Sequence, residues 1–205
     1  MRSRTGYALM EIGSMVTQET IWFFHFRFAK SLQAAAILLR TNDAHRMNLM
    51  KLLKLLYIAD REALAETGRP ITGDRTVALP RGPLPGTVYD VIKGLHVESG
   101  RWEDYIQRVH YTLHLVEDPG RKRLSPFEIR KLQEVAERHT DDDEWEMVRI
   151  THKLPEWKKN RPGRSSRDIP TVDILEAVGR TDVGKILEDL NASMAFDQLI
   201  NAQRR

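Results

Sequence analysis

Apolar residues recur at helical spacing along most of the chain, and this pattern predicts a mainly helical protein. The two longest runs cover residues 22–40 and about 48–66. Residues that favour turns end both runs, the first at 41–43 (Thr-Asn-Asp) and the second at Gly68 with Pro70. Further helices are expected at about 85–95, after Ser125, from Thr140 to about His152, near 171–178, and from Thr181 to the C-terminus.

The helix after Ser125 has the clearest start. In the sequence Ser-Pro-Phe-Glu, Ser125 can cap the helix, proline suits its first turn, and Glu128 can reach back to a free backbone N–H. The apolar residues that follow keep helical spacing: Ile129, Leu132, Val135 and Ala136.

Two short segments show a strand pattern instead. Thr76–Leu79 is a β-prone run between two proline-containing turns. Residues 109–116 alternate, with Val109, Tyr111, Leu113 and Leu115 on one face and histidines and a threonine on the other, as in a half-buried strand. We therefore expect a mainly α fold, a compact multi-helix domain with a few short β-strands in the middle.

The helix at 48–66 places a carboxylate among apolar residues. On a helical projection Leu49, Leu53, Leu56 and Asp60 share one face, flanked by Tyr57, whereas Lys54, Ile58 and Arg61 lie on the opposite, wetter side. A buried carboxylate costs several kcal/mol unless it is paired and hydrogen-bonded. The expected partners are in the loop at 69–83: Arg69, Arg75, and backbone N–H groups near Gly73 or Gly82. We interpret Asp60 as a structural latch that fastens this loop to the helix.

Composition narrows the class of protein. The 205 residues are 41% hydrophobic and carry a formal charge of +3, which is ordinary for one soluble domain with appendages and too small an excess to indicate nucleic acid by itself. Without cysteine there is no disulfide framework, thiolate nucleophile or cysteine zinc site. The apolar run at 21–29 is too short to span a membrane and contains Arg27, so we expect a cytoplasmic protein without a membrane partner.

Three segments are expected. Residues 1–21 form an N-terminal extension that we expect to be disordered, and Met15 is an alternative start to Met1. Residues 22–180 form the helical domain, and 181–205 form a C-terminal helical extension.

The order of several motifs resembles the Panacea domain, the SocA-like family of bacterial and phage antitoxins. The core helix KLLKLLYIADREAL is followed by GRPITGD and by GPLP before a helix. Downstream, LSPFEIRKLQEV resembles the capped helix of the family, ITHKLPEW its segment from His152 to Trp157, and IPTVDIL the end of its domain. The resemblance covers about residues 24–178. We assign the structural latch to Tyr57, Asp60, Gly82 and Pro83.

The resemblance implies an antitoxin that neutralises a cognate toxin, encoded by an adjacent gene, through direct protein contact. It also implies a second route, in which the protein delivers the toxin to an ATP-dependent protease. Rigid, charged surfaces suit such recognition because little ordering entropy is lost on binding. The residues expected to contact the toxin lie on the loop and on the wet side of the core helix: Lys54, Ile58, Arg61, Arg69, Asp74, Arg75 and Arg81.

Other functions remain as alternatives. The basic loop at 158–167 and Arg121–Arg123 favour, as runner-up, a DNA-binding regulator or a phage accessory protein. An enzyme acting through Asp60 and Asp74 is the least favoured class, because no phosphate loop, nucleophile elbow or His-Glu-x-x-His motif is present. His110 and His114 on one strand would lie about 13 Å apart, too far for one metal ion. We therefore expect no catalytic residue, no cofactor and no metal site.

Overall fold

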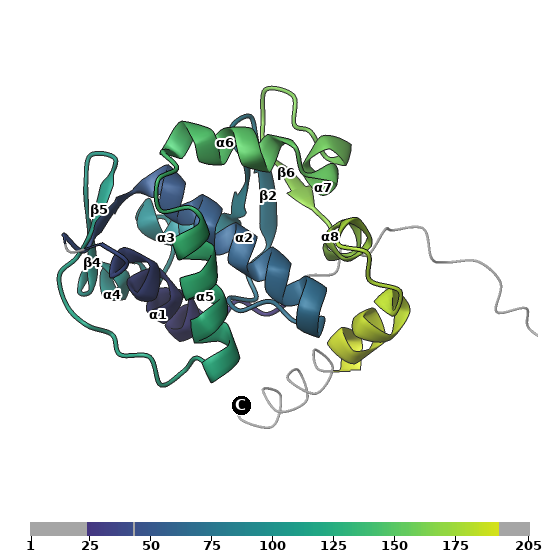
Figure 1. Ribbon diagram of the computed structural model, residues 1–205, viewed down its shortest axis with the longest axis horizontal. Helices are drawn as coiled ribbons and strands as arrows, with labels where there is room; N and C mark the ends of the chain where they lie inside the picture. The colour runs from purple at the N-terminus through teal and green to yellow at the C-terminus, as the bar shows by residue number, and fades with distance from the viewer. Residues whose placement is uncertain (1–23, 43, 193–205) are drawn as a thin grey trace, which may run out of the picture.

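The structure is a computed structural model that describes residues 24–42 and 44–192 (Figure 1). The expected extension at 1–21 and the last part of the expected C-terminal helix lie outside the described residues. The helices are α1 (Phe28–Leu39), α2 (Leu49–Thr67), α3 (Gly86–Ile92), α4 (Ser99–Glu103), α5 (Pro126–Arg138), α6 (Glu144–His152), α7 (Pro155–Lys159) and α8 (Thr171–Ala177). The strands are β1 (Arg46–Asn48), β2 (Thr76–Leu79), β3 (Gly82–Pro85), β4 (Ile106–Val109), β5 (Thr112–Leu115) and β6 (Arg167–Ile169).

Helix α2 is the centre of the fold. The side chain of Asn48 accepts a hydrogen bond from the N–H of Met50 at its start, and Gly68 ends it in a left-handed conformation with φ of 72°. Helices α1, α5, α6 and α8 and strand β3 all contact α2 (Figure 1). Because neighbours surround it, α2 is buried around nearly its whole circumference.

This surrounding overturns the prediction of a wet side on α2. Lys54 is 1% exposed and Ile58 is 7% exposed, so neither lies on a solvent-exposed stripe of α2. Arg61 is half-buried against Glu156 of α7. The charged residues Lys54 and Arg61 on that side of α2 make polar contacts with β3 and α7.

Two small antiparallel sheets complete the fold, with strand orders β1-β5-β4 and β3-β2-β6. In the second sheet, β2 pairs with β3 through a tight hairpin and with β6 on its other side, where Val77 lies opposite Asp168. The prediction of a mainly helical domain therefore holds in its coarse form, but the sheets make the fold mixed rather than plainly all-α.

The alternating segment at 109–116 is a hairpin rather than one strand. The chain reverses at His110, whose φ is 55°, and Tyr111, so that Val109 pairs with Thr112. As a result Val109 and Tyr111 are 54% and 75% exposed, whereas the sequence pattern predicts that they share a buried face with Leu113.

The helix predictions fare better. The Ser125–Glu128 capping box is present. Helix α6 begins at Glu144, capped by Asp143, rather than at the predicted Thr140. The structure adds α4, α7, β1, β3 and β6 to the elements predicted from the sequence. A further helix covers residues 183–192, and its Ile186 lies against Gly68 at the end of α2.

Candidate functional site

Asp60 lies at the junction of α2 and the loop at 69–75, and it is 8% exposed. Its Oδ1 accepts hydrogen bonds from the backbone N–H groups of Ile71 and Thr72 at 2.8 and 2.9 Å, and its Oδ2 accepts one from the Thr72 hydroxyl. Burial raises the pKa of Asp60 to about 6, although these hydrogen bonds oppose the rise. The carboxylate thus fastens the loop to α2, and its donors are two backbone N–H groups and the Thr72 hydroxyl rather than an arginine.

Two of the loop charges expected to contact a toxin have internal partners instead. The two oxygens of Asp74 accept hydrogen bonds from the N–H groups of Thr87 and Val88, at 2.9 and 2.7 Å, in the first turn of α3. Burial raises the pKa of Asp74. Arg75 donates to Asp168 of β6 at 3.1 Å and forms an ion pair with Asp90 of α3 at 3.0 Å. Both residues therefore hold the second sheet against α3.

Arg69 and Arg81 are the loop residues that remain on the surface. The guanidinium of Arg81, in the turn between β2 and β3, lies 5.1 Å from the centre of the Trp145 ring.

Gly82 and Pro83 bring the β2–β3 hairpin onto α2 and α6. Gly82 has φ of 97°, and a Cβ atom there would lie 2.7 Å from Thr151 Oγ1 and 2.8 Å from Lys54 Nζ. Only glycine therefore fits this approach without displacing its neighbours. Pro83 contributes its carbonyl oxygen, which accepts a hydrogen bond from Lys54 Nζ at 2.6 Å.

Tyr57 and Arg61 converge on a carboxylate that the sequence pattern did not nominate. Glu156 of α7 is 1% exposed and accepts hydrogen bonds from the Tyr57 hydroxyl at 2.6 Å and from Arg61 Nε at 2.7 Å. Burial and the Glu156 charge raise the pKa of Tyr57 well above its ordinary value. This triad ties α7 to α2, and Glu156 was missed because a charged residue in a short, polar segment gives no sign of burial.

His152 and Trp157 lie in the same region. Their rings stack with centroids 4.0 Å apart, and Trp157 Nε1 donates to the carbonyl of Leu79 at 3.1 Å. Burial and the nearby Lys54 lower the pKa of His152. The two residues join α6 and α7 to the β2–β3 hairpin.

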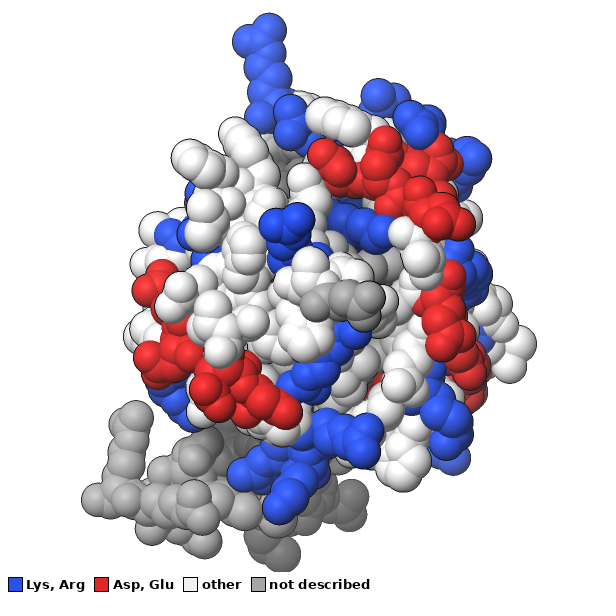
Figure 2. Space-filling model, turned by 60° about the vertical axis from the view of Figure 1, so that its left-hand side comes forward, with Lys and Arg blue, Asp and Glu red and all other residues white. Residues whose placement is uncertain are grey.

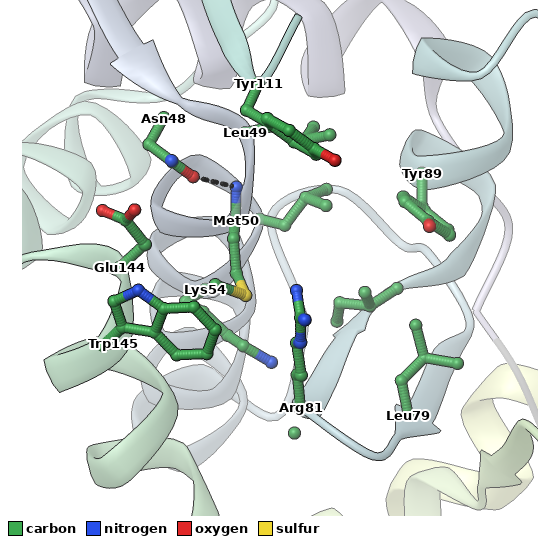
Figure 3. Close-up of a pocket in the computed structure, with 13 residues that line it drawn as sticks. Asn48, Leu49, Met50, Lys54, Leu79, Arg81, Tyr89, Tyr111, Glu144 and Trp145 are labelled. Carbon is green, nitrogen blue, oxygen red and sulfur yellow. Dashed lines mark hydrogen bonds between the residues drawn. The ribbon is translucent and has the colours of Figure 1, made fainter. Parts of the chain in front are cut away.

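A pocket of about 320 Å³ opens where the start of α2, the β2–β3 hairpin and α6 meet, and we call it the aromatic pocket (Figure 3). Trp145 of α6 and Tyr111 of the β4–β5 turn stand on its walls and are 48% and 75% exposed. Arg81 projects between them, and the Lys54 amine points toward Arg81 from behind Trp145 (Figure 3). Leu49, Leu79 and Tyr89 line the rest of the wall.

Exposed aromatic side chains around a hollow are typical of protein-binding surfaces. Sequence reasoning missed Trp145 and Tyr111. Trp145 sits in an acidic helix start and Tyr111 in a segment read as a strand. An unexplained tryptophan on the polar face of α6 was the one available signal.

Two classes of feature are not found in the part of the chain that the structure describes. No three His, Asp or Glu side chains lie close enough together to hold a metal ion. No described helix has the length and hydropathy needed to cross a bilayer. The buried charges instead fasten loops and helices to one another, as in a rigid scaffold that presents a surface.

Comparison with known families shows to which family this scaffold belongs. The sequence profile described as antitoxin SocA-like, Panacea domain matches residues 52–158, which is 107 of the 205 residues. The chain therefore belongs to the SocA-like Panacea family of antitoxins. No curated protein and no solved structure matches it significantly. The matched segment runs from α2 to α7 and includes Asp60, Gly82, Trp145 and Glu156.

Proposed function

We propose that this protein is an antitoxin that neutralises a toxin, encoded by the adjacent gene, by binding it directly. The observation that carries the proposal is the match of its central 107 residues to an antitoxin family. The aromatic pocket supports it, because Trp145 and Tyr111 are the residue types that dominate binding energy in protein interfaces.

We further propose that the toxin covers the mouth of the aromatic pocket. Arg81 lies at this mouth, and rigid turns on either side hold it, so binding would order little additional chain. Arg69 is exposed on the loop that Asp60 holds and is a second candidate contact. Ile58 is buried, and Lys54, Arg61, Asp74 and Arg75 each bond to another part of the fold, so we do not propose them as contacts on the outer surface.

The test is co-expression with the neighbouring gene product in bacteria. Wild-type protein should restore growth and co-purify with the toxin. Trp145→Ala together with Tyr111→Ala should weaken the complex about 30-fold or more, as expected when about 2 kcal/mol of interface energy is lost. Val97→Ala is the control, because Val97 is 94% exposed and does not line the pocket.

The outcomes separate the function from the interface. A neighbouring protein that is not toxic, or that does not bind, contradicts the proposed function. A folded double variant that still rescues growth contradicts the assigned interface alone. The amount of toxin in the rescued cells distinguishes the routes of neutralisation, because delivery to an ATP-dependent protease lowers it whereas blocking leaves it unchanged.

DNA binding receives less support from the surface. Two basic side chains of the loop at 158–167 have partners within the protein. Lys159 pairs with Asp173 at 2.8 Å, and the Arg161 guanidinium lies 5.6 Å from the Trp157 ring centre. Figure 2 shows acidic side chains in two groups on the face displayed, with basic and uncharged residues between them. A salt-sensitive gel shift on the gene's own promoter would favour this alternative.

A further inference from the structure

Lys54 is a buried cation without a counter-charge. It is 1% exposed, and among the described residues its ammonium has one hydrogen-bond acceptor, the carbonyl of Pro83 at 2.6 Å. An ammonium carries three N–H donors, so two of them have no acceptor within residues 24–42 and 44–192. A buried charge is costly unless it is paired, and burial lowers the pKa of Lys54 to about 7.

Arg81 brings a second cation to the same place. Its guanidinium contacts the Trp145 ring and forms no ion pair with any carboxylate in the described part of the chain. Glu144 also lines the aromatic pocket but is ion-paired with neither cation. Figure 3 shows the Lys54 amine directed toward Arg81. A Cβ atom at Gly82 would lie 2.8 Å from Lys54 Nζ, so the glycine leaves space beside the amine that a side chain would fill.

The walls of the aromatic pocket are apolar. Trp145, Tyr111, Tyr89 and Leu49 surround the two cations (Figure 3). A ligand suited to such a site carries a negative charge at the end of a carbon stem, because the stem packs on the rings while the charge meets donors in a partly desolvated site. A carboxylate accepts several hydrogen bonds and fits both an ammonium and a guanidinium.

We infer that the aromatic pocket receives an acidic side chain of the toxin, whose carboxylate pairs with Lys54 and Arg81. The inference rests on the proposed function and names the chemical group that the antitoxin recognises. The same group supplies the counter-charge that Lys54 lacks in the free protein.

A small acid tests the pocket without any toxin. The probe is 3-phenylpropionate, a carboxylate on an apolar stem, and the control ligand is its uncharged analogue 3-phenylpropanamide. Binding to the full-length protein at pH 6.5 is followed by the NMR signal of the Trp145 indole N–H. We expect the acid to bind about tenfold more tightly than the amide, as a charge-assisted pair requires.

Variants then assign this preference to the two cations. Lys54→Met and Arg81→Met should each reduce acid binding about tenfold, with little effect on the amide. Lys51→Met is the matched control, since Lys51 lies one turn earlier on α2 and donates to the Thr140 carbonyl at 3.0 Å outside the pocket. If Lys54→Met does not fold, Arg81→Met still gives a result because its side chain is exposed.

Three results would overturn the inference. They are equal binding of acid and amide, no binding of the acid, and an unchanged preference in folded Lys54→Met and Arg81→Met. Co-purification with the toxin then tests the source of the carboxylate: both variants should weaken the complex, and 3-phenylpropionate should compete with it. If the probe binds but neither substitution weakens the complex with the toxin, the pocket binds a free acid rather than a toxin residue. The inference is then wrong, while the proposed function stands.

Discussion

Replacing Lys54 by methionine should remove a pH-dependent step in the stability of this protein. The side chain is 1% exposed and crosses from α2 to the β2–β3 hairpin, where its amine meets the Pro83 carbonyl. Methionine has a similar length and no charge, so it should fill the same space. Losing the hydrogen bond to Pro83 changes the free energy of unfolding by the same amount at every pH. The part of the stability difference that varies with pH therefore reports the charge of Lys54.

The magnitude follows from the shift in pKa. Burial lowers the pKa of Lys54 from 10.5 to about 7. Between these values the unfolded chain holds a proton that the folded protein has released, so the free energy of unfolding rises with pH. The full step is about 5 kcal/mol, at about 1.4 kcal/mol per pH unit, of which about 2 kcal/mol falls between pH 7 and pH 9, because the amine is still about half protonated at pH 7. Lys54→Met lacks this step.

Urea unfolding, monitored by circular dichroism at pH 7, 8 and 9, measures this step in the free energy of unfolding. The wild type should gain stability relative to Lys54→Met by more than about 1 kcal/mol per pH unit across this window. The window is favourable because the pKa of Asp60, about 6, and the lowered pKa of His152 both lie below it. Lys51→Met should follow the wild type. Parallel pH profiles for wild type and Lys54→Met would refute the reasoning, since they would mean that the buried amine keeps its ordinary pKa.

Two further variants test the contacts around α2. Gly82→Ala should destabilise the protein by about 3 kcal/mol in urea unfolding, because its Cβ would meet Thr151 and Lys54, whereas Gly94→Ala has a similar positive φ with nothing within 4 Å and should cost only about 1 kcal/mol. Equal costs would contradict the close approach. Asp60→Ala should lower the free energy of unfolding by about 3 kcal/mol, since the N–H groups of Ile71 and Thr72 lose their acceptor. Asp60→Asn should lower it clearly less, because the amide oxygen of asparagine can still accept these hydrogen bonds. A smaller cost for the alanine variant would contradict the role of Asp60.

Local signals along the chain predict the elements whose cause is local. The cap at Ser125, the acidic start of α6 and the glycine stop after α2 depend on side chains within a few residues of the backbone groups they serve. Such contacts join residues that are close together in the sequence. The longer helices were therefore predictable, whereas the short helices α4 and α7 were not. The hairpin at His110 was not predictable either, because its strand alternation continues through the turn.

Which residues of α2 are buried depends on the elements that pack against it, and the sequence pattern does not show which elements these are. Lys54 and Arg61 have the spacing of a solvated face, yet the Pro83 carbonyl and Glu156 receive them, and these partners lie 29 and 95 residues away. The residue types alone cannot distinguish a solvated lysine from one that spans a contact. The prediction that this side of α2 is exposed to solvent was wrong for this reason.

The same packing explains where the candidate site is found. Asp60, Glu156 and Lys54 fasten the loop, α7 and the hairpin to α2. The exposed residues around the aromatic pocket, Arg81, Trp145 and Tyr111, come from three separate elements. A binding surface assembled this way has no linear motif. Because the contacts to α2 are buried beneath this exposed rim, substitutions at Arg81, Trp145 or Tyr111 should change what the pocket binds while leaving the contacts to α2 intact.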